Sequence, residues 1–164
     1  MSKTSKIHNC IYLAPPKGTI YIIRHREGTT TNCVSSKSFF DVQDVCKKVK
    51  ELNVQKVLTR YPYNDKHIRP IQTAANICSL INKSLELFYD ASSLPNIDSC
   101  NILIVWNHND MNSILSRYGL IGKVVWPDDN YQGCIRINEF GWEYDSNFLN
   151  NNGFLEDCCM YLLL

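Results

Sequence analysis

The sequence predicts an α/β protein, namely a three-layer α/β/α sandwich with a mostly parallel central sheet. Two short apolar runs, Thr19–Ile23 and Asn101–Trp106, are rich in β-branched residues, which is typical of strands buried on both faces. Apolar residues with a spacing near 3.6 follow the first of these runs, as in an amphipathic helix. Strands that alternate with helices in this way imply right-handed parallel crossovers.

The first half of the chain contains the first predicted crossover. After the strand at 19–23, residues 26–33 are polar and lack periodicity, so we expect a loop there. Ser38 is expected to cap a helix whose apolar face reaches Leu52. Residues 55–59 form a short apolar run that predicts the second strand.

The second half continues the alternation and ends in a different pattern. The apolar spacing over 71–81 predicts a second helix, and residues 110–118, followed by Gly119, predict a third. The strands expected in this half span residues 85–89, 101–106, 123–126 and 133–137. We expect the last two, which flank a turn at 127–130, to lie at the edge of the sheet.

Length and charge restrict the kind of protein. A chain of 164 residues suits one domain, which we place at 19–145, between an irregular lead-in at 1–18 and an acidic, Asn-rich tail at 146–164. The net charge of +1 gives no reason to expect a nucleic-acid or membrane partner. Residues 1–60 nevertheless carry 11 basic and 4 acidic side chains, which favours an anionic ligand in that half.

The eight cysteines do not indicate a disulfide framework. Residues 1–18 lack the apolar core of a signal peptide, so we expect a cytoplasmic location and reduced thiols. Cys46, Cys78 and Cys134 lie within apolar patterns, where a free cysteine behaves as a small buried hydrophobic residue. No CxxC pair has a matching partner, and we therefore expect neither a metal site nor a cofactor.

Basic side chains follow two of the predicted strands. Arg24 and His25 end the first strand, and His108 comes shortly after the strand at 101–106. In open α/β sheets, ligands bind outside the carboxyl ends of the strands. If the two strands are neighbours, both imidazoles are expected in one crevice.

Three motifs in order resemble those of the histidine phosphatase (phosphoglycerate-mutase-like) superfamily. They are Arg24-His25, then Arg69-Pro70-Ile71-Gln72-Thr73-Ala74 at the start of a helix, then the strand that leads into His108. The short chain and the His108-Asn109 pair look most like the small, single-domain phosphohistidine-phosphatase branch. The resemblance implies a metal-independent phosphatase that acts through a phosphohistidine intermediate on a phosphorylated small molecule or a phosphoprotein.

The resemblance also implies roles for individual residues. His25 is the nucleophile, with one ring nitrogen attacking phosphorus while the other donates to a carbonyl. Two arginines and a second histidine contact the phosphoryl oxygens, because charge spreads over these oxygens in the transition state. The implied phosphate contacts are Arg24, Arg69 and His108, with hydrogen bonds from Thr29, Asn32 and Asn109.

The chain departs from the family pattern at three places. Arg26 stands where the family has glycine, and its guanidinium is expected either to clamp the phosphate or to obstruct the pocket. The segment before Arg69 is longer than in the family; Arg60 and His67 within it are either further phosphate contacts or exposed loop residues, and we favour the second interpretation. The general acid has no diagnostic motif, and its candidates are Glu86, Asp90 and Asp110.

Three classes of function follow from these features. The first is the phosphatase, and the second is a degenerate domain that binds phosphorylated ligands or proteins without turnover. The third is a plain α/β interaction domain, for which the three motifs are coincidental. A mutase is less favoured, since it needs additional structure around residues 91–100. No pattern indicates an oligomeric state.

Overall fold

The computed structural model describes residues 18–26, 36–63, 67–97, 99–150 and 161–162. They form one seven-stranded sheet in the order β3-β2-β4-β1-β5-β6-β7. The strands are β1 (Ile20–Arg24), β2 (Lys56–Arg60), β3 (Leu85–Phe88), β4 (Ile102–Trp106), β5 (Cys134–Asn138), β6 (Gly141–Asp145) and β7 (Tyr161–Leu162). The helices are α2 (Ser36–Glu51), α3 (Ile68–Ile81) and α4 (Met111–Arg117), with 3₁₀ turns η1 (Ala91–Ser93), η2 (His108–Asp110) and η3 (Phe148–Asn150).

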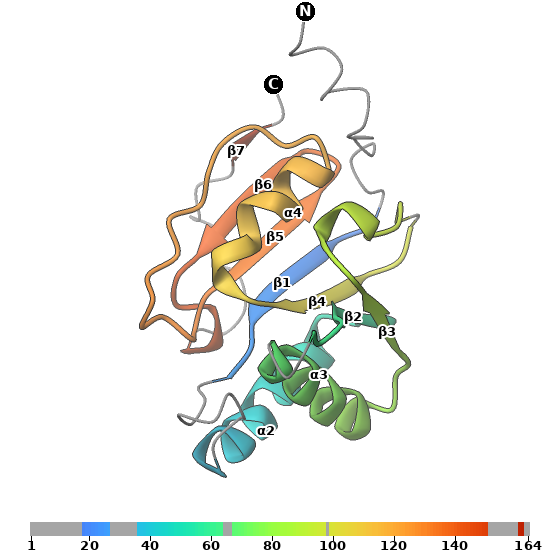
Figure 1. The fold of residues 1–164 in the computed structure, drawn as a ribbon, viewed down its shortest axis with the longest axis vertical. Helices are drawn as coiled ribbons and strands as arrows, with labels where there is room; N and C mark the ends of the chain where they lie inside the picture. The colour runs from blue at the N-terminus through green and yellow to red at the C-terminus, as the bar shows by residue number, and fades with distance from the viewer. Residues whose placement is uncertain (1–17, 27–35, 64–66, 98, 151–160, 163–164) are drawn as a thin grey trace, which may run out of the picture.

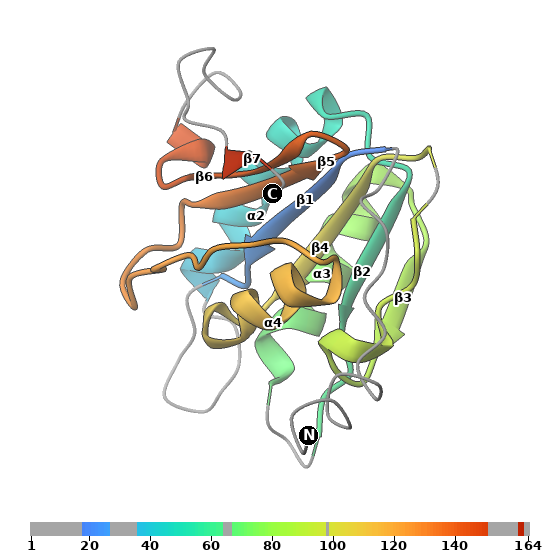
Figure 2. The same ribbon diagram turned by 90° about the horizontal axis from the view of Figure 1, so that it is seen from above.

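The sheet has a parallel half and an antiparallel half. β3, β2, β4 and β1 pair in parallel, whereas β5, β6 and β7 continue the sheet from β1 in antiparallel fashion. Helices α2 and α3 cover one face and α4 covers the other, which gives three layers (Figures 1 and 2). The predicted α/β sandwich with a mostly parallel sheet is therefore confirmed. The antiparallel half consists of the β5–β6 hairpin and the short strand β7.

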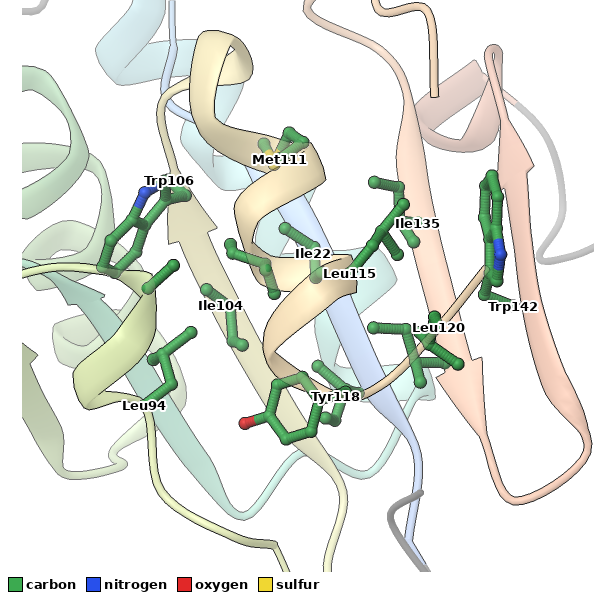
Figure 3. Close-up of a cluster of buried hydrophobic side chains, with 14 of the residues drawn as sticks. Ile22, Leu94, Ile104, Trp106, Met111, Leu115, Tyr118, Leu120, Ile135 and Trp142 are labelled. Carbon is green, nitrogen blue, oxygen red and sulfur yellow. The ribbon is translucent and has the colours of Figure 1, made fainter. Parts of the chain in front are cut away.

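The core beneath α4 contains the larger side chains. Ile22 of β1 and Ile104 of β4 pack with Met111 and Leu115 of α4, and all four side chains are buried (Figure 3). Trp106 closes this core at the carboxyl end of β4, fully buried. Strands with apolar side chains on both faces need a helix on each side, which explains the sandwich.

The opposite core lies beneath α2 and α3 and contains the predicted buried cysteines. Ile23 and Val105 point to this side, because successive residues of a strand face opposite ways. Cys46, Cys78 and Cys134 pack here, as expected. Burial raises the pKa of the Cys46 and Cys78 thiols to about 11, so both stay protonated at neutral pH.

Two strand expectations about the second half of the chain are wrong. The strand at 133–137, observed as β5, lies inside the sheet between β1 and β6 and not at its edge. Residues 123–126 form no strand, because the backbone of Val124 bonds to the Asn112 side chain of α4: the Val124 N–H donates to Asn112 Oδ1 (2.8 Å), and Asn112 Nδ2 donates to the Val124 carbonyl (3.2 Å). The packed structure also extends past residue 145, since Phe148 is fully buried in the core beneath α2 and α3.

None of the helices in the described residues is long and apolar enough to cross a bilayer.

The feature of the fold that matters for function is its parallel half. The carboxyl ends of β3, β2, β4 and β1 lie along one edge of the sheet, so the residues that follow these strands are placed in a row.

Candidate active site

The register between β1 and β4 decides which side chains meet at this edge. Arg24 is opposite Trp106, so the next residues along the two strands are His25 and Asn107. The His25 N–H donates to the Trp106 carbonyl (3.2 Å), which extends the ladder by one bond. His25 therefore lies beside Asn107, and the expected neighbour His108 comes one residue later.

A cavity of about 100 Å³ opens at this place. It is lined by His25, Asn107 and the amino-terminal turn of α3 with the residue before it, namely His67, Ile68, Arg69 and Pro70. A volume of this size holds several water molecules, each of which needs about 10–15 Å³. None of these six lining residues carries a carboxylate, and the cavity is suited to a small oxyanion.

His25 is buried and held in one tautomer. Only 6% of the residue is exposed, and its Nδ1 lies 2.8 Å from the Arg26 carbonyl oxygen. A carbonyl only accepts, so Nδ1 carries the proton and Nε2 keeps its lone pair. Burial is the main cause that lowers the His25 pKa to about 4. The hydrogen bond to the Arg26 carbonyl raises the pKa by less than burial lowers it, and the charges of the nearby arginines lower it further. The imidazole is therefore neutral at physiological pH and has a nucleophilic nitrogen.

This shifted pKa predicts an acid-sensitive fold. Below pH 6.5 the unfolded chain binds a proton at His25, whereas the folded protein does not until about pH 4. We expect this difference to lower the free energy of unfolding by about 3 kcal/mol between these two pH values, and by nothing above pH 7. Urea denaturation at several pH values will measure the loss, and the His25→Asn variant should lack it. The same slope in both proteins would contradict the burial of a neutral imidazole.

Arg69 contributes the positive charge of the cavity wall. It lies in the first turn of α3, as predicted, where backbone N–H groups and the helix dipole favour an anion. Its charge lowers the pKa of both Arg24 and His25, which places the three groups close together. His67 precedes the helix with φ 59°, a left-handed conformation that is uncommon outside glycine.

Arg24 holds the loop at 127–131 through hydrogen bonds. Its Nη1 donates to the carbonyls of Asp128 (2.5 Å) and Asn130 (3.2 Å), and its Nη2 donates to the Tyr131 hydroxyl (3.2 Å). The guanidinium also lies 3.9 Å from the centre of the Tyr131 ring, and the centres of the Tyr131 and His25 rings are 6.2 Å apart in a T-shaped arrangement. Arg24 thus braces residues 127–131, and its predicted contact with phosphate stays a prediction.

His108 is near this loop and outside the cavity wall. Its Nε2 is 2.7 Å from Asp128 Oδ1, and the carboxylate side chain is almost completely exposed. The expectation that strand order would bring His25 and His108 into one crevice is met only in part, because the strands are neighbours but His108 is not among the lining residues. An exposed pair of this kind is worth little to stability.

Arg26 is buried, and its expected role toward the phosphate, as a clamp or an obstruction, stays a prediction. Its side chain is among the largest fully buried ones, only 2% exposed, and its Nη2 donates to the Arg24 carbonyl (2.9 Å). The Arg26 backbone N–H donates to Thr73 Oγ1 of α3 (3.0 Å). Arg26 is absent from the lining of the cavity, so its described contacts support the strand end and α3.

Asn107 is a wall residue that the sequence analysis missed. Its Oδ1 accepts a hydrogen bond from Arg60 Nη1 (2.9 Å), and Arg60 also pairs with Asp110 (3.5 Å). An arginine only donates, so the oxygen of the amide faces Arg60 and the Asn107 NH₂ group is left for the cavity. The interpretation of Arg60 and His67 as exposed loop residues is therefore wrong: Arg60 orients the wall and His67 belongs to it.

The candidates for a general acid lie outside the wall. Asp110 accepts from Trp106 Nε1 (3.0 Å) and pairs with Arg60, which places it behind Asn107. Glu86 lies within β3 and pairs with Lys56 (3.8 Å), and Asp90 caps the η1 turn. Of the predicted hydrogen-bond donors, Asn109 is exposed in η2, whereas Thr29 and Asn32 lie outside the described residues.

These features define a class of protein: an α/β sandwich with a strand-terminal neutral histidine beside an arginine-lined, anion-sized cavity. No protein-family model and no curated protein matches the chain. Among solved structures, the fold is similar to that of SixA from Agrobacterium tumefaciens, described as a proposed phosphohistidine phosphatase. The TM-score is 0.54 at 11% identity, over 79% of this chain and 95% of SixA, so the two proteins share the fold.

Proposed function

We propose that this protein belongs to the histidine phosphatase superfamily and hydrolyses phosphomonoesters or phosphoproteins without a metal, through a phosphohistidine on His25. The observation that carries the proposal is the neutral, tautomer-fixed imidazole of His25 in the wall of a cavity that also contains Arg69. The shared fold with SixA, whose description names a phosphohistidine phosphatase, gives independent support.

The proposed reaction has two steps. His25 Nε2 attacks phosphorus, the nitrogen–phosphorus bond forms, and the bond to the leaving oxygen breaks, after which that oxygen takes up a proton from solvent water. A second water then attacks phosphorus and releases a proton to solvent, the nitrogen–phosphorus bond breaks, phosphate leaves, and the imidazole returns to its neutral form. In this proposal Arg69 and the Asn107 amide, both of which line the cavity, donate to the phosphoryl oxygens in both steps.

A second candidate function is binding of phosphorylated ligands without turnover. It is favoured by the described part of the cavity lining, whose six residues include no carboxylate to protonate the leaving oxygen. The engagement of Arg24 with the loop at 127–131 favours it as well. With no acid, only leaving groups that depart as stable anions are expelled at a useful rate, so aryl phosphates are the substrates on which the two functions differ most.

Turnover of p-nitrophenyl phosphate in the presence of a chelator tests the proposal. We expect hydrolysis that vanadate inhibits, and much slower hydrolysis of an alkyl phosphate such as glycerol phosphate. Stabilisation by vanadate against thermal unfolding without turnover would instead support binding alone. If vanadate neither inhibits nor stabilises, both functions are wrong. Loss of turnover on chelation, restored by zinc or magnesium, would remove the metal-independent mechanism.

Replacing Arg69 with lysine is expected to weaken vanadate binding by roughly 1–3 kcal/mol, the range for hydrogen bonds to charged groups. Lysine keeps the charge and loses the paired donors of the planar guanidinium. Calorimetric titration of vanadate measures the change. Arg117→Lys is the matched control, because Arg117 lies on α4 and donates to the Leu94 carbonyl instead. Equal affinities in the Arg69→Lys variant and the wild type would mean that the guanidinium does not contact the anion.

A further inference from the structure

Three tyrosines form an exposed aromatic cluster that none of the site chemistry uses. Tyr61, Tyr63 and Tyr89 are 40%, 42% and 56% exposed. Their rings contact one another, with centroid distances of 5.0 Å for Tyr61 and Tyr89, 5.8 Å for Tyr63 and Tyr89, and 6.1 Å for Tyr61 and Tyr63. Aromatic rings gathered at the surface are typical of binding sites, where each presents an apolar face and a polar tip.

The cluster lies on the same edge of the sheet as the cavity. Tyr61 directly follows β2 and Tyr89 directly follows β3, and the Tyr61 N–H donates to the Phe88 carbonyl (2.7 Å), which fixes these strand ends together. The strand order β3-β2-β4-β1 gives the row Tyr89, Tyr61, Asn107 and His25. Neighbouring strands in a sheet are about 4.8 Å apart. The backbone of Tyr61, two strands away, is therefore roughly 10 Å from the backbone of His25, and that of Tyr89, three strands away, is roughly 14 Å from it.

The residue between the cavity and the cluster connects them. Arg60 ends β2 immediately before Tyr61, and its guanidinium bonds to Asn107 in the cavity wall. A molecule whose phosphate occupies the cavity has to extend along the edge past Arg60 to contact the tyrosines. The size of the cluster argues for a small occupant, since a stable protein interface needs about 800 Å² from each partner, and three half-exposed rings supply only part of that area.

We propose that the tyrosine cluster binds a planar aromatic ring on the leaving-group side of the phosphoester, which makes aromatic phosphomonoesters the substrate class. This inference rests on the proposed function, because it takes the cavity to be the phosphate site. Tyrosine faces stack on aromatic rings of many kinds, so simple aryl esters and nucleoside monophosphates share the required chemistry.

Binding of two phosphonates tests the inference without turnover, because the carbon–phosphorus bond is not hydrolysed. We expect naphthylmethylphosphonate to bind about tenfold more tightly than methylphosphonate, the ratio that one aromatic stack gives. The triple variant Tyr61→Ser, Tyr63→Ser, Tyr89→Ser should lose this preference and keep its affinity for methylphosphonate. The corresponding triple phenylalanine variant should keep the preference, since the rings are retained.

Two further ligands identify the source of the ring. Tighter binding of adenosine monophosphate than of ribose 5-phosphate would support the inference with nucleotides as the source, and a preference confined to the naphthyl compound would support it with simple aryl esters. Phe140, 65% exposed in the turn between β5 and β6 at the opposite edge, supplies the control, and Phe140→Ser should leave every ratio unchanged.

Two kinds of result would overturn the inference. The first would leave the proposed function intact, and the second would overturn the proposed function as well. Equal binding of both phosphonates to the wild type, or a preference that survives the triple serine variant, would exclude an aromatic site while the phosphate site stands. If neither phosphonate nor inorganic phosphate binds, the proposed function is wrong, and the inference is wrong with it.

Discussion

Replacing His25 with alanine is expected to lower the rate of aryl phosphate hydrolysis on the order of 10³-fold or more, because the attacking nitrogen is removed. The Arg26 carbonyl fixes the tautomer of this imidazole, and burial keeps it neutral. Rapid quenching of the wild-type reaction should in addition trap a phosphorylated histidine that is labile to acid and stable to base. Mass spectrometry of the digested protein is expected to place the phosphoryl group on His25.

His108→Ala is the matched control for this experiment. Both side chains are imidazoles near the same edge, but His108 bonds to Asp128 and lies outside the cavity wall. We therefore expect a smaller loss of rate and an unchanged site of phosphorylation. A phosphoryl group on His108, or a His25→Ala variant as fast as the wild type, would show that the nucleophile has been misassigned.

Local sequence patterns were sufficient for most of the fold. Apolar runs predicted β1 and β4, and helical spacing predicted α3 and α4, because burial of apolar side chains dominates the choice of these elements. The strand predicted at 123–126 failed for a reason that no local pattern contains. A side chain of α4, Asn112, takes the hydrogen bonds of Val124 that a neighbouring strand would otherwise make.

The sequence predicted where the candidate site lies, but not which residues line it. The rule that ligands bind at the carboxyl ends of strands predicted His25 at this edge, where it lines the cavity, but the neighbour of His25 depends on the register of the two strands. Since Arg24 is opposite Trp106, Asn107 and not His108 lies beside His25. When the register of two paired strands shifts by one residue, each side chain meets a different neighbour and faces the other side of the sheet. The spacing of residues along the chain does not reveal this register.

Alternation along β1 also explains why Arg24 and His25 have different contacts. Neighbouring residues of a strand point to opposite faces, so the Arg24 guanidinium reaches the loop at 127–131 while His25 meets the first turn of α3. Tyr131 contacts both, and it lies more than 100 positions from them in the sequence. Contacts over such a separation come from the tertiary fold, which is why Tyr131 was missed.

Replacing Arg26 with glycine is expected to lower the free energy of unfolding by about 2–4 kcal/mol, the range for deleting a large buried side chain that is hydrogen-bonded. The Arg26 side chain is 2% exposed and donates to the Arg24 carbonyl. Its removal leaves space between the end of β1 and α3. Urea denaturation will measure the loss, and saturating vanadate is expected to restore part of the stability in the variant, as it does for any protein that binds the anion when folded.

Arg26→Met separates the packing of this residue from its charge. Methionine fills much of the same volume, so we expect Arg26→Met to be more stable than Arg26→Gly. Without the positive charge, one of the influences that lower the His25 pKa is lost, so the pH range over which His25 destabilises the fold should narrow from its lower end and the total loss of stability should be slightly smaller. Because Arg26 does not line the cavity, Arg26→Met is expected to weaken vanadate binding less than Arg69→Lys does. A larger loss in Arg26→Met would mean that the Arg26 guanidinium contacts the anion, as a clamp in place of the glycine of the family pattern.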